Sequence, residues 1–218
     1  TLLLALPAAA GFGCAWRMNW GWCWPLAVLL FLLWLGGLAF FRDPEREVPG
    51  APGLLVSPAD GKVVEIVKLD NDDLIGGPAT RISIFLSVFN VHVNRSPCAG
   101  VVRSVYYRPG RYLDARDPQS GLLNEANTIV IDPDDQAAGP VVVRQIAGLI
   151  ARRIVCTVKP GERLTRGQRI GLIKFGSRTE LIMPGHDLHE PVVRVGDQAR
   201  GALTVMARTS RGGMESKP

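Results

Sequence analysis

Two apolar segments at the start of the chain constrain its fold more than any other feature of the sequence. Residues 1–16 and 20–41 contain no charged side chain, and only Arg17, Met18 and Asn19 separate them. The second segment, 22 residues long, is long enough for a helix to cross a bilayer core of about 30 Å. The first, at 16 residues, would be a short span, a re-entrant arm or an interfacial helix.

All five tryptophans of the chain fall in this region: Trp16, Trp20, Trp22, Trp24 and Trp34. The first four cluster where the two segments meet. Indole rings favour the boundary between water and lipid. A cleaved signal peptide is the alternative, but no basic start and no A-x-A site are present. A hairpin buried in a soluble core is disfavoured because 22 uncharged residues are long for a globular helix. The pattern predicts a membrane-associated helical hairpin.

The remainder of the chain begins with a charged, proline-containing join at residues 42–46, followed by further Pro and Gly. Such a composition is typical of a linker next to a membrane. Arg42 and Arg46 lie just outside the apolar segment, and this placement favours the cytoplasmic side of the cell (inner) membrane. We therefore predict two parts, the hairpin over residues 1–41 and a domain over residues 42–218.

Charge and cysteine content narrow the class of protein further. The chain carries a formal net charge of +5, which suits an anionic lipid surface. The basic residues are too few and too scattered for a nucleic-acid site. Four isolated cysteines without a C-x-x-C spacing do not indicate a disulfide framework.

Beyond residue 41 the pattern is one of short runs rich in Val and Ile between turn signals. Six runs are predicted as strands: 62–68, 81–86, 101–107, 128–131, 141–146 and 153–158. A weak repeat joins Val158–Gly167 to Val193–Gly201, each with a Gly-acid turn. It resembles the half-motif of biotinyl/lipoyl-type barrel-sandwich hybrids. We expect a mainly β catalytic domain, a β-sandwich of this hybrid kind.

Few residues of the chain have side chains suited to catalysis. The three histidines are His92, His186 and His189. The last two form a His-x-x-His pair, but Pro184, Gly185 and Pro191 indicate a loop and no third ligand is apparent; no metal site is expected. His92 lies on an apolar stretch, where a histidine is more often a hydrogen-bonded core residue than a catalyst. By the same reasoning, the sequence around Asp60 is interpreted first as an ordinary turn between two strands, because Asp followed by Gly is typical of such a turn.

The pair Gly176-Ser177 permits a chemistry beyond that of an ordinary turn. A serine hydroxyl can attack the preceding carbonyl and shift the acyl group from nitrogen to oxygen. β-Elimination then breaks the chain, and loss of ammonia leaves a pyruvoyl group. Glycine offers an unhindered carbonyl and tolerates unusual backbone angles. A Gly-Ser pair alone is weak support for this chemistry.

Five motifs together resemble the short-form, prokaryotic phosphatidylserine decarboxylase proenzymes, in the family's order and from about residue 40 to residue 207. They are Phe41-Arg-Asp-Pro44, Ser57-Pro-Ala-Asp60-Gly-Lys62, Phe85-Leu-Ser87 with Asn90-Val-His92-Val-Asn94-Arg95-Ser-Pro97-Cys-Ala-Gly100, Asn124-Glu-Ala-Asn127, and Phe175-Gly176-Ser177-Arg178. The resemblance implies a zymogen that cleaves itself between Gly176 and Ser177. The products would be a β chain, 1–176, and an α chain, 177–218, associated as a heterodimer.

The resemblance also implies the reaction. The amine of phosphatidylserine forms a Schiff base with the covalent pyruvoyl derived from Ser177, and decarboxylation yields phosphatidylethanolamine without metal or pyridoxal phosphate. His92 would return a proton to the α-carbon, and Asp60 would orient His92 or act as base during maturation. Asn94 and Arg95 are candidates for substrate binding. Whether the heterodimer assembles further stays open.

Two positions depart from the family pattern. Longer relatives carry a second histidine where this chain has Arg95, so only His92 can serve as an imidazole. The arginine of the family's Asn-Glu-Arg-Asn motif is replaced by Ala126, which puts an arginine-mediated role there in doubt. Two rival functions remain: a membrane-bound serine hydrolase using Ser177, His92 and Asp60, although no G-x-S-x-G elbow is present, and a non-enzymatic anchored barrel-sandwich domain.

Overall fold

A computed structural model describes residues 23–117, 119–149, 153–173, 176–185 and 187–210. The chain divides into two compact units, residues 1–44 and 45–218.

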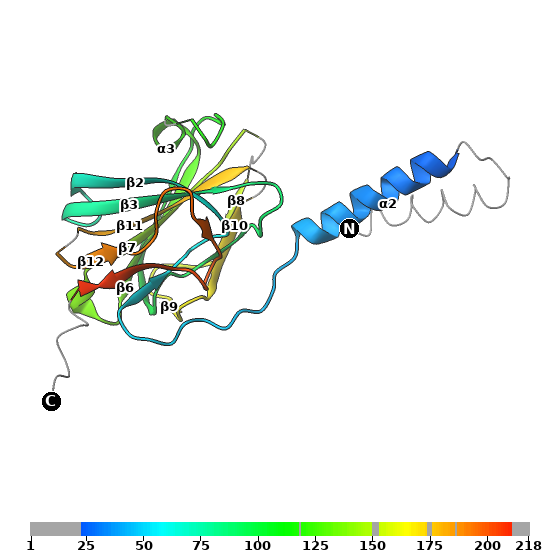
Figure 1. Cartoon of the computed structure of the whole chain (residues 1–218). Coiled ribbons are helices and arrows are strands. Elements are labelled where there is room, and N and C mark those ends of the chain that lie inside the picture. The colour runs from blue at the N-terminus through cyan, green and yellow to red at the C-terminus, as the bar shows by residue number, and fades with distance from the viewer. Residues whose placement is uncertain (1–22, 118, 150–152, 174–175, 186, 211–218) are drawn as a thin grey trace. The chain divides into compact units, whose positions relative to one another are not determined.

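The first unit contains helix α2, Cys23–Phe40, an uninterrupted run of 18 residues without a charged side chain (Figure 1). Its leucines are about half exposed, for example Leu29, Leu32 and Leu33. Among the described helices, none combines the length and the apolar character needed to cross a membrane. The predicted first arm, residues 1–16, lies outside the described residues, so the hairpin stays a prediction.

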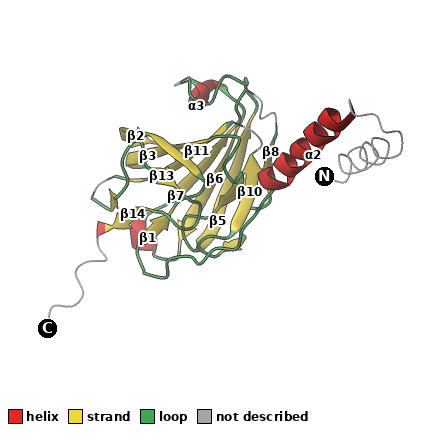
Figure 2. Ribbon diagram, turned by 45° about the vertical axis from the view of Figure 1, so that its right-hand side comes forward, coloured by secondary structure: helices red, strands yellow, loops and turns green. Residues whose placement is uncertain are grey.

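The second unit is mainly β, as predicted, and its described residues include little helix (Figure 2). Its elements are β1 Leu54–Val56, β2 Gly61–Asp72, β3 Gly77–Leu86, β4 Val93–Arg95, β5 Gly100–Arg108, α3 Ser120–Leu123, β6 Ala126–Pro133, η1 Gln136–Ala138, β7 Val141–Ile146, β8 Ile154–Cys156, β9 Arg163–Leu164, β10 Arg169–Ile173, β11 Ser177–Pro184, β12 His189–Pro191, β13 Gln198–Ala199 and β14 Val205–Thr209. All six predicted runs overlap strands.

Three sheets make up the described part of this unit. The largest has eight strands in the order β13-β2-β3-β11-β7-β6-β5-β9 and curls into a half-barrel. The other two have the orders β1-β14-β12 and β4-β10-β8. Because β-branched side chains pack well on a pleated surface, the inner faces of the central strands are fully buried. The large, fully buried apolar side chains include Ile82, Ile84, Ile129, Ile131 and Leu181.

The eight-stranded sheet is built from two equivalent halves. Residues 57–63 and 96–102 share the pattern Ser-Pro-x-x-Gly-x-Val, and in each the serine hydroxyl donates to a carbonyl two residues later over 2.7 Å. Val63 and Val102 each form the same pair of backbone hydrogen bonds with a Gly-acid turn. These turns are the two copies of the sequence repeat. The likeness to a barrel-sandwich hybrid stays a prediction.

Candidate active site

Ser177 is the first residue of β11, one of the two central strands of the large sheet. It pairs with Leu86 of β3, and the next residue, Arg178, pairs with Ile146 of β7. The Ser177 side chain is completely buried, and its Oγ makes no hydrogen bond within the described part of the chain. A buried polar group left unsatisfied costs about 1–3 kcal/mol, and such an exception in a native structure calls for an explanation.

Gly176 precedes this hydroxyl and has a left-handed backbone, with φ of 59°. Glycine adopts this conformation without the penalty that a Cβ would bring. Gly176 also lines a cavity of about 340 Å³. The other residues that line it are Phe85, Ser87, Val88, Asp114, Arg116 and Leu149. The peptide bond between Gly176 and Ser177 therefore lies between a buried hydroxyl and a cavity.

The cavity combines apolar walls with one ion pair. Arg116 donates to both oxygens of Asp114, and its guanidinium lies 6.0 Å from the centre of the Phe85 ring. The hydrogen bonds from Arg116 lower the pKa of Asp114 to about 2. Phe85 belongs to a motif of the sequence, but sequence reasoning missed Asp114 and Arg116 because they lie in a loop without a local motif. The hydrogen bonds of Asn124 to Leu113 and Ala147 hold this loop beside the end of β7, and β7 pairs with β11.

His92 lies just before β4 and is buried. Its backbone oxygen accepts from the Ile173 amide over 3.2 Å, which places it beside the chain segment leading to Ser177. The Nδ1 atom lies 2.8 Å from the Asn90 carbonyl oxygen. Because a carbonyl can only accept, Nδ1 carries the hydrogen, and Nε2 is the nitrogen that can take up a proton.

Asp60 lies at the same end of the large sheet as Ser177. The pairing of Lys62 with Phe85, and of Ser177 with Leu86, places the start of β2 two strands from Ser177, about 10 Å away at ordinary strand spacing. The Asp60 carboxylate accepts from Arg46 over 2.5 and 2.9 Å and from the Gly201 amide over 2.7 Å. These hydrogen bonds, rather than one to His92, hold it.

The two halves of the sheet show what the turn itself requires. Asp60 in the first half corresponds to Ala99 in the second, by the shared Ser-Pro-x-x-Gly pattern. The second turn keeps its serine–carbonyl bond without a carboxylate. The turn therefore does not require an acidic residue at this position. Because a buried ion pair often adds little net stability, the pair between Asp60 and Arg46 is weak support for a purely stabilising role of Asp60.

Asn94 and Arg95, the predicted substrate-binding residues, both lie in the interior. Asn94 donates to Thr179 Oγ1 over 3.0 Å and accepts from Gln145 over 2.9 Å. Gln145 in turn accepts from Asn127 over 2.9 Å. Arg95 is buried and donates to the Gly167 carbonyl. Neither residue lines the cavity at Gly176, so their role in substrate binding stays a prediction.

The Asn124 motif holds the backbone around β7. Asn124 Nδ2 donates to the carbonyl oxygens of Leu113 and Ala147, over 2.9 and 2.8 Å, and Oδ1 accepts from the Leu113 amide. The neighbouring Glu125 accepts from the hydroxyl of Tyr112 over 2.7 Å. These contacts fasten the loop containing Leu113 to the end of β7 without any arginine at position 126.

Arg178, beside Ser177, points to the opposite face of the sheet, because strand side chains alternate. Its guanidinium lies 2.5 Å from Glu65 and 3.1 Å from the fully buried Glu180. Arg144 lies 3.3 Å from Glu180. The basic residue of the Phe-Gly-Ser-Arg motif thus belongs to a charge cluster on the opposite face of the sheet from Ser177.

The remaining histidines give no metal centre within the described part of the chain. His186 lies outside the described residues. His189 is buried in β12 and interacts through Nε2 with the Ala138 carbonyl over 2.8 Å; burial lowers its pKa. Across the described residues, no cluster of three or more His, Cys, Asp or Glu could hold a metal ion.

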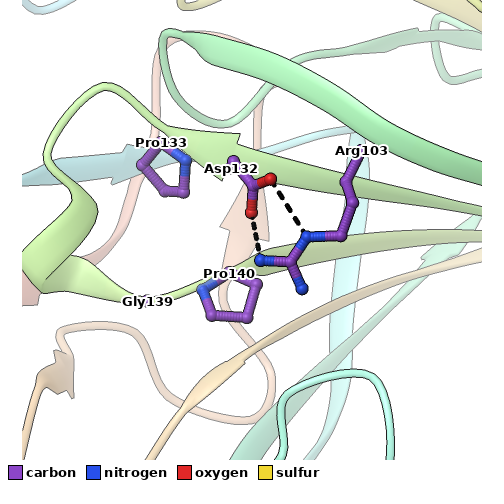
Figure 3. Close-up of a pocket in the computed structure, with 5 residues that line it drawn as sticks. All are labelled: Arg103, Asp132, Pro133, Gly139 and Pro140. Carbon is purple, nitrogen blue, oxygen red and sulfur yellow. Dashed lines mark hydrogen bonds and ion pairs between the residues drawn. The ribbon is translucent and has the colours of Figure 1, made fainter. Parts of the chain in front are cut away.

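A second cavity of about 340 Å³ contains none of the predicted residues (Figure 3). Arg103 and Asp132 face one another across it through a two-point ion pair, with Pro133, Gly139 and Pro140 completing its wall. This pair is exposed to solvent and contributes little to stability. The cavity at Gly176 is therefore the better candidate.

A mainly β domain with an unsatisfied buried serine beside a cavity is better suited to an enzyme than to an inert scaffold. Comparison with known proteins identifies the kind of enzyme. The family model described as "Phosphatidylserine decarboxylase" matches residues 37–207. The chain belongs to this family, and it is therefore a carboxy-lyase.

Curated relatives named "Phosphatidylserine decarboxylase proenzyme" match most of the chain. The protein of Rhodopirellula baltica is 47% identical over 89% of this chain and 80% of its own length. That of Nitratidesulfovibrio vulgaris is 45% identical over 86% and 84%. That of Ralstonia pickettii is 43% identical over 94% and 87%. The name proenzyme implies that these relatives are made as precursors.

Proposed function

We propose that this protein decarboxylates phosphatidylserine to phosphatidylethanolamine, using a pyruvoyl group formed from Ser177 when the chain cleaves itself after Gly176. The observation that carries the proposal is the buried Oγ of Ser177, unsatisfied within the described residues, next to a left-handed glycine that lines a cavity. Family membership supplies the reaction class, and the relatives' names supply the substrate.

The proposed maturation uses only the chain's own atoms and water. Ser177 Oγ attacks the Gly176 carbonyl carbon, and its proton passes to a base, for which Asp60 is the candidate. The C–N bond breaks as the amide nitrogen takes up a proton, leaving an ester. Loss of the Ser177 α-proton breaks the Cβ–Oγ bond, which releases the Gly176 carboxylate. Water then replaces ammonia at residue 177, and the α chain starts with a ketone.

The residues around this position fit such a group. The pyruvoyl ketone supplies an electron sink for the charge left by departing carbon dioxide. His92 delivers the proton to the substrate's α-carbon, since its Nε2 is the nitrogen that exchanges protons. Phe85, Val88 and Leu149 give the cavity an apolar wall, and Arg116 offers a cation to the phosphate of the headgroup.

The N-terminal unit would keep the enzyme at its substrate. A helical hairpin over residues 1–41, with a cytoplasmic catalytic domain, places the cavity on the same membrane as the lipid. Two features support this: residues 20–41 carry no charge, and the large apolar side chains of α2 are exposed.

Ser177→Ala tests the proposal directly. Alanine lacks the hydroxyl needed for both the attack and the elimination, so we expect a folded, uncut protein without decarboxylase activity. The wild type should yield two fragments, the smaller starting at a blocked residue 177. Intact-mass analysis together with carbon dioxide release measures both. A cut at the same bond in Ser177→Ala, or an uncut but active wild type, would contradict the proposal.

A further inference from the structure

Gly148, the second residue after β7, lies in unusually close contact with the bond that the proposed function cleaves. Extending the β11–β7 register beyond the pair Arg178–Ile146 places Gly148 opposite Gly176. A Cβ on Gly148 would lie 1.8 Å from the Gly176 carbonyl oxygen and 2.9 Å from its carbonyl carbon. No side chain larger than hydrogen fits there unless one of the two backbones moves.

The contacted oxygen is the atom on which charge develops during maturation. When Ser177 Oγ attacks, the Gly176 carbonyl becomes tetrahedral and its oxygen becomes negative. The direction in which this oxygen points decides which face of the carbonyl meets the hydroxyl. Backbone Cα–H groups also make weak favourable contacts with oxygen, so a bare Cα can remain against an oxygen whose charge is rising.

We propose that Gly148 is a positioning residue for self-cleavage, because its bare Cα lets the Gly176 carbonyl lie in the orientation that Ser177 attacks. This inference rests on the proposed function, since it concerns a step of that maturation. It also assigns a role to the Asn124 motif, whose hydrogen bond to the Ala147 carbonyl holds the backbone next to Gly148.

The backbone at Gly148 is held from several sides, so it cannot easily retreat from an added methyl group. The amide of Ala147 donates to the Glu125 carbonyl over 2.9 Å, and the Ala147 carbonyl accepts from Asn124. On another side, the Cβ of Ala115 would lie 3.4 Å from a Cβ on Gly148. An alanine at position 148 would therefore displace the Gly176 carbonyl rather than the end of β7.

The experiment compares Gly148→Ala with Gly100→Ala in the full-length chain. Gly100 is a matched control because its Cβ would also meet a carbonyl oxygen, that of Asp132, at 2.2 Å, within β5 and β6. Each chain is pulse-labelled in cell-free translation with phospholipid vesicles, and cleavage is followed by gel and intact mass. Melting temperatures of the purified proteins report how much each substitution disturbs the fold.

We expect Gly148→Ala to lower the cleavage rate about 100-fold or more, as misplacement of reacting groups by about 1 Å does elsewhere. Gly100→Ala should cleave at close to the wild-type rate, even if its melting temperature falls as far as that of Gly148→Ala. Hydroxylamine, which cleaves esters, should release no fragment from uncut Gly148→Ala, because the block precedes ester formation. Release of a fragment would place the block at the elimination and overturn the inference.

The other outcomes are equally decisive. A folded Gly148→Ala that cleaves within about threefold of the wild-type rate overturns the inference and leaves the proposed function intact. If Gly100→Ala has the same melting temperature as Gly148→Ala and its cleavage is slowed equally, the effect is a general structural one, and the inference about Gly148 is overturned. An uncut wild type overturns the proposed function itself. If Gly148→Ala fails to fold, Ala115→Val presses on Gly148 without adding a Cβ there; slowed cleavage supports the inference, and an unchanged rate rejects it.

Discussion

At the scale of single residues, the polar groups near Ser177 differ in what their partners leave them free to do. The carbonyl of Asn90 fixes the tautomer of His92, and this leaves the imidazole able to exchange a proton. The carboxylate of Asp60 is held by Arg46 and the Gly201 amide, and it can act as a base only within that environment. These partners agree with the proposed roles, in which Asp60 acts during maturation and His92 during decarboxylation.

Asp60→Asn should stall self-cleavage, because an amide accepts no proton from the hydroxyl. His92→Ala should slow cleavage less than it slows turnover of the pyruvoyl enzyme that does form. Cleavage rate by gel, alongside carbon dioxide released per mole of pyruvoyl, separates the two effects. If Asp60→Asn matures normally and loses only turnover, the roles are reversed.

Arg46→Gln is the control for this experiment, because it breaks the same ion pair and keeps the carboxylate. Leaving a buried charge uncompensated costs up to about 3–5 kcal/mol, so Arg46→Gln should lower the free energy of unfolding at least as much as Asp60→Asn. Cleavage should nevertheless proceed in folded Arg46→Gln. Equal loss of cleavage in both variants would reduce Asp60 to a structural role.

At the scale of elements, a chain of buried amides joins the small sheet containing β4 to the large sheet. Asn94 of β4 reaches Thr179 of β11 and Gln145 of β7, and Gln145 reaches Asn127 of β6. Thr179 is two residues from Ser177 and therefore on the same face of β11. The hydrogen bonds fix β4, and His92 just before it, relative to the strand that starts at the cleavage site.

Gln145→Leu should lower the free energy of unfolding, because the Asn94 oxygen and the Asn127 amide each lose their partner in the interior. An orphaned buried group costs about 1–3 kcal/mol, and urea titration of the uncut Ser177→Ala background measures the total. Adding Asn127→Leu removes one orphaned group, so the double variant should lose less than the sum. Strict additivity would show that the amides are not coupled.

The elements also show where sequence reasoning succeeds. β2, β3, β5, β6 and β7 were predictable, since Val and Ile recur in them between clear turns. β11 was not among the predicted runs, because Arg178 and Glu180 interrupt its apolar pattern. Their partners Glu65 and Arg144 come from distant strands, and only the sheet pairing makes buried charges acceptable there.

The residues of the candidate site could be predicted only where they belong to a short motif of neighbouring residues. Gly176 and Ser177 form a dipeptide with its own reactivity, and His92 and Asp60 belong to recognisable motifs. Asp114, Arg116 and Leu149 lie on loops and carry no local signal. Gly148 also could not be predicted, because its proposed role depends on its contact with Gly176, which lies opposite it where the adjacent strands β7 and β11 are extended.

At the scale of the whole molecule, the apolar start of the chain and the catalytic domain form separate compact units. None of the residues proposed for cleavage or decarboxylation lies before residue 45. On the proposed function, maturation is a reaction within the second unit, whereas access to the lipid substrate depends on the full chain.

Deleting residues 1–41 should release the protein from membranes and leave self-cleavage intact. Sedimentation with phosphatidylserine vesicles and a gel of the soluble fraction measure the two properties. Turnover should fall on vesicles more than on detergent-dispersed lipid, because attachment raises the local substrate concentration. A truncated protein that is folded yet uncut would show that the N-terminal unit contributes to maturation.

The position of β11 in the middle of the large sheet dictates an order of events in time. A separately made 177–218 segment would begin with an ordinary serine amine and could never acquire a ketone, since the acyl partner would be missing. Its strands pair with β2, β3, β7 and β1, all encoded before the cleavage site. On the proposed maturation, the protein must therefore fold first and be cut afterwards, and a gene divided at this codon would yield an enzyme that lacks the ketone.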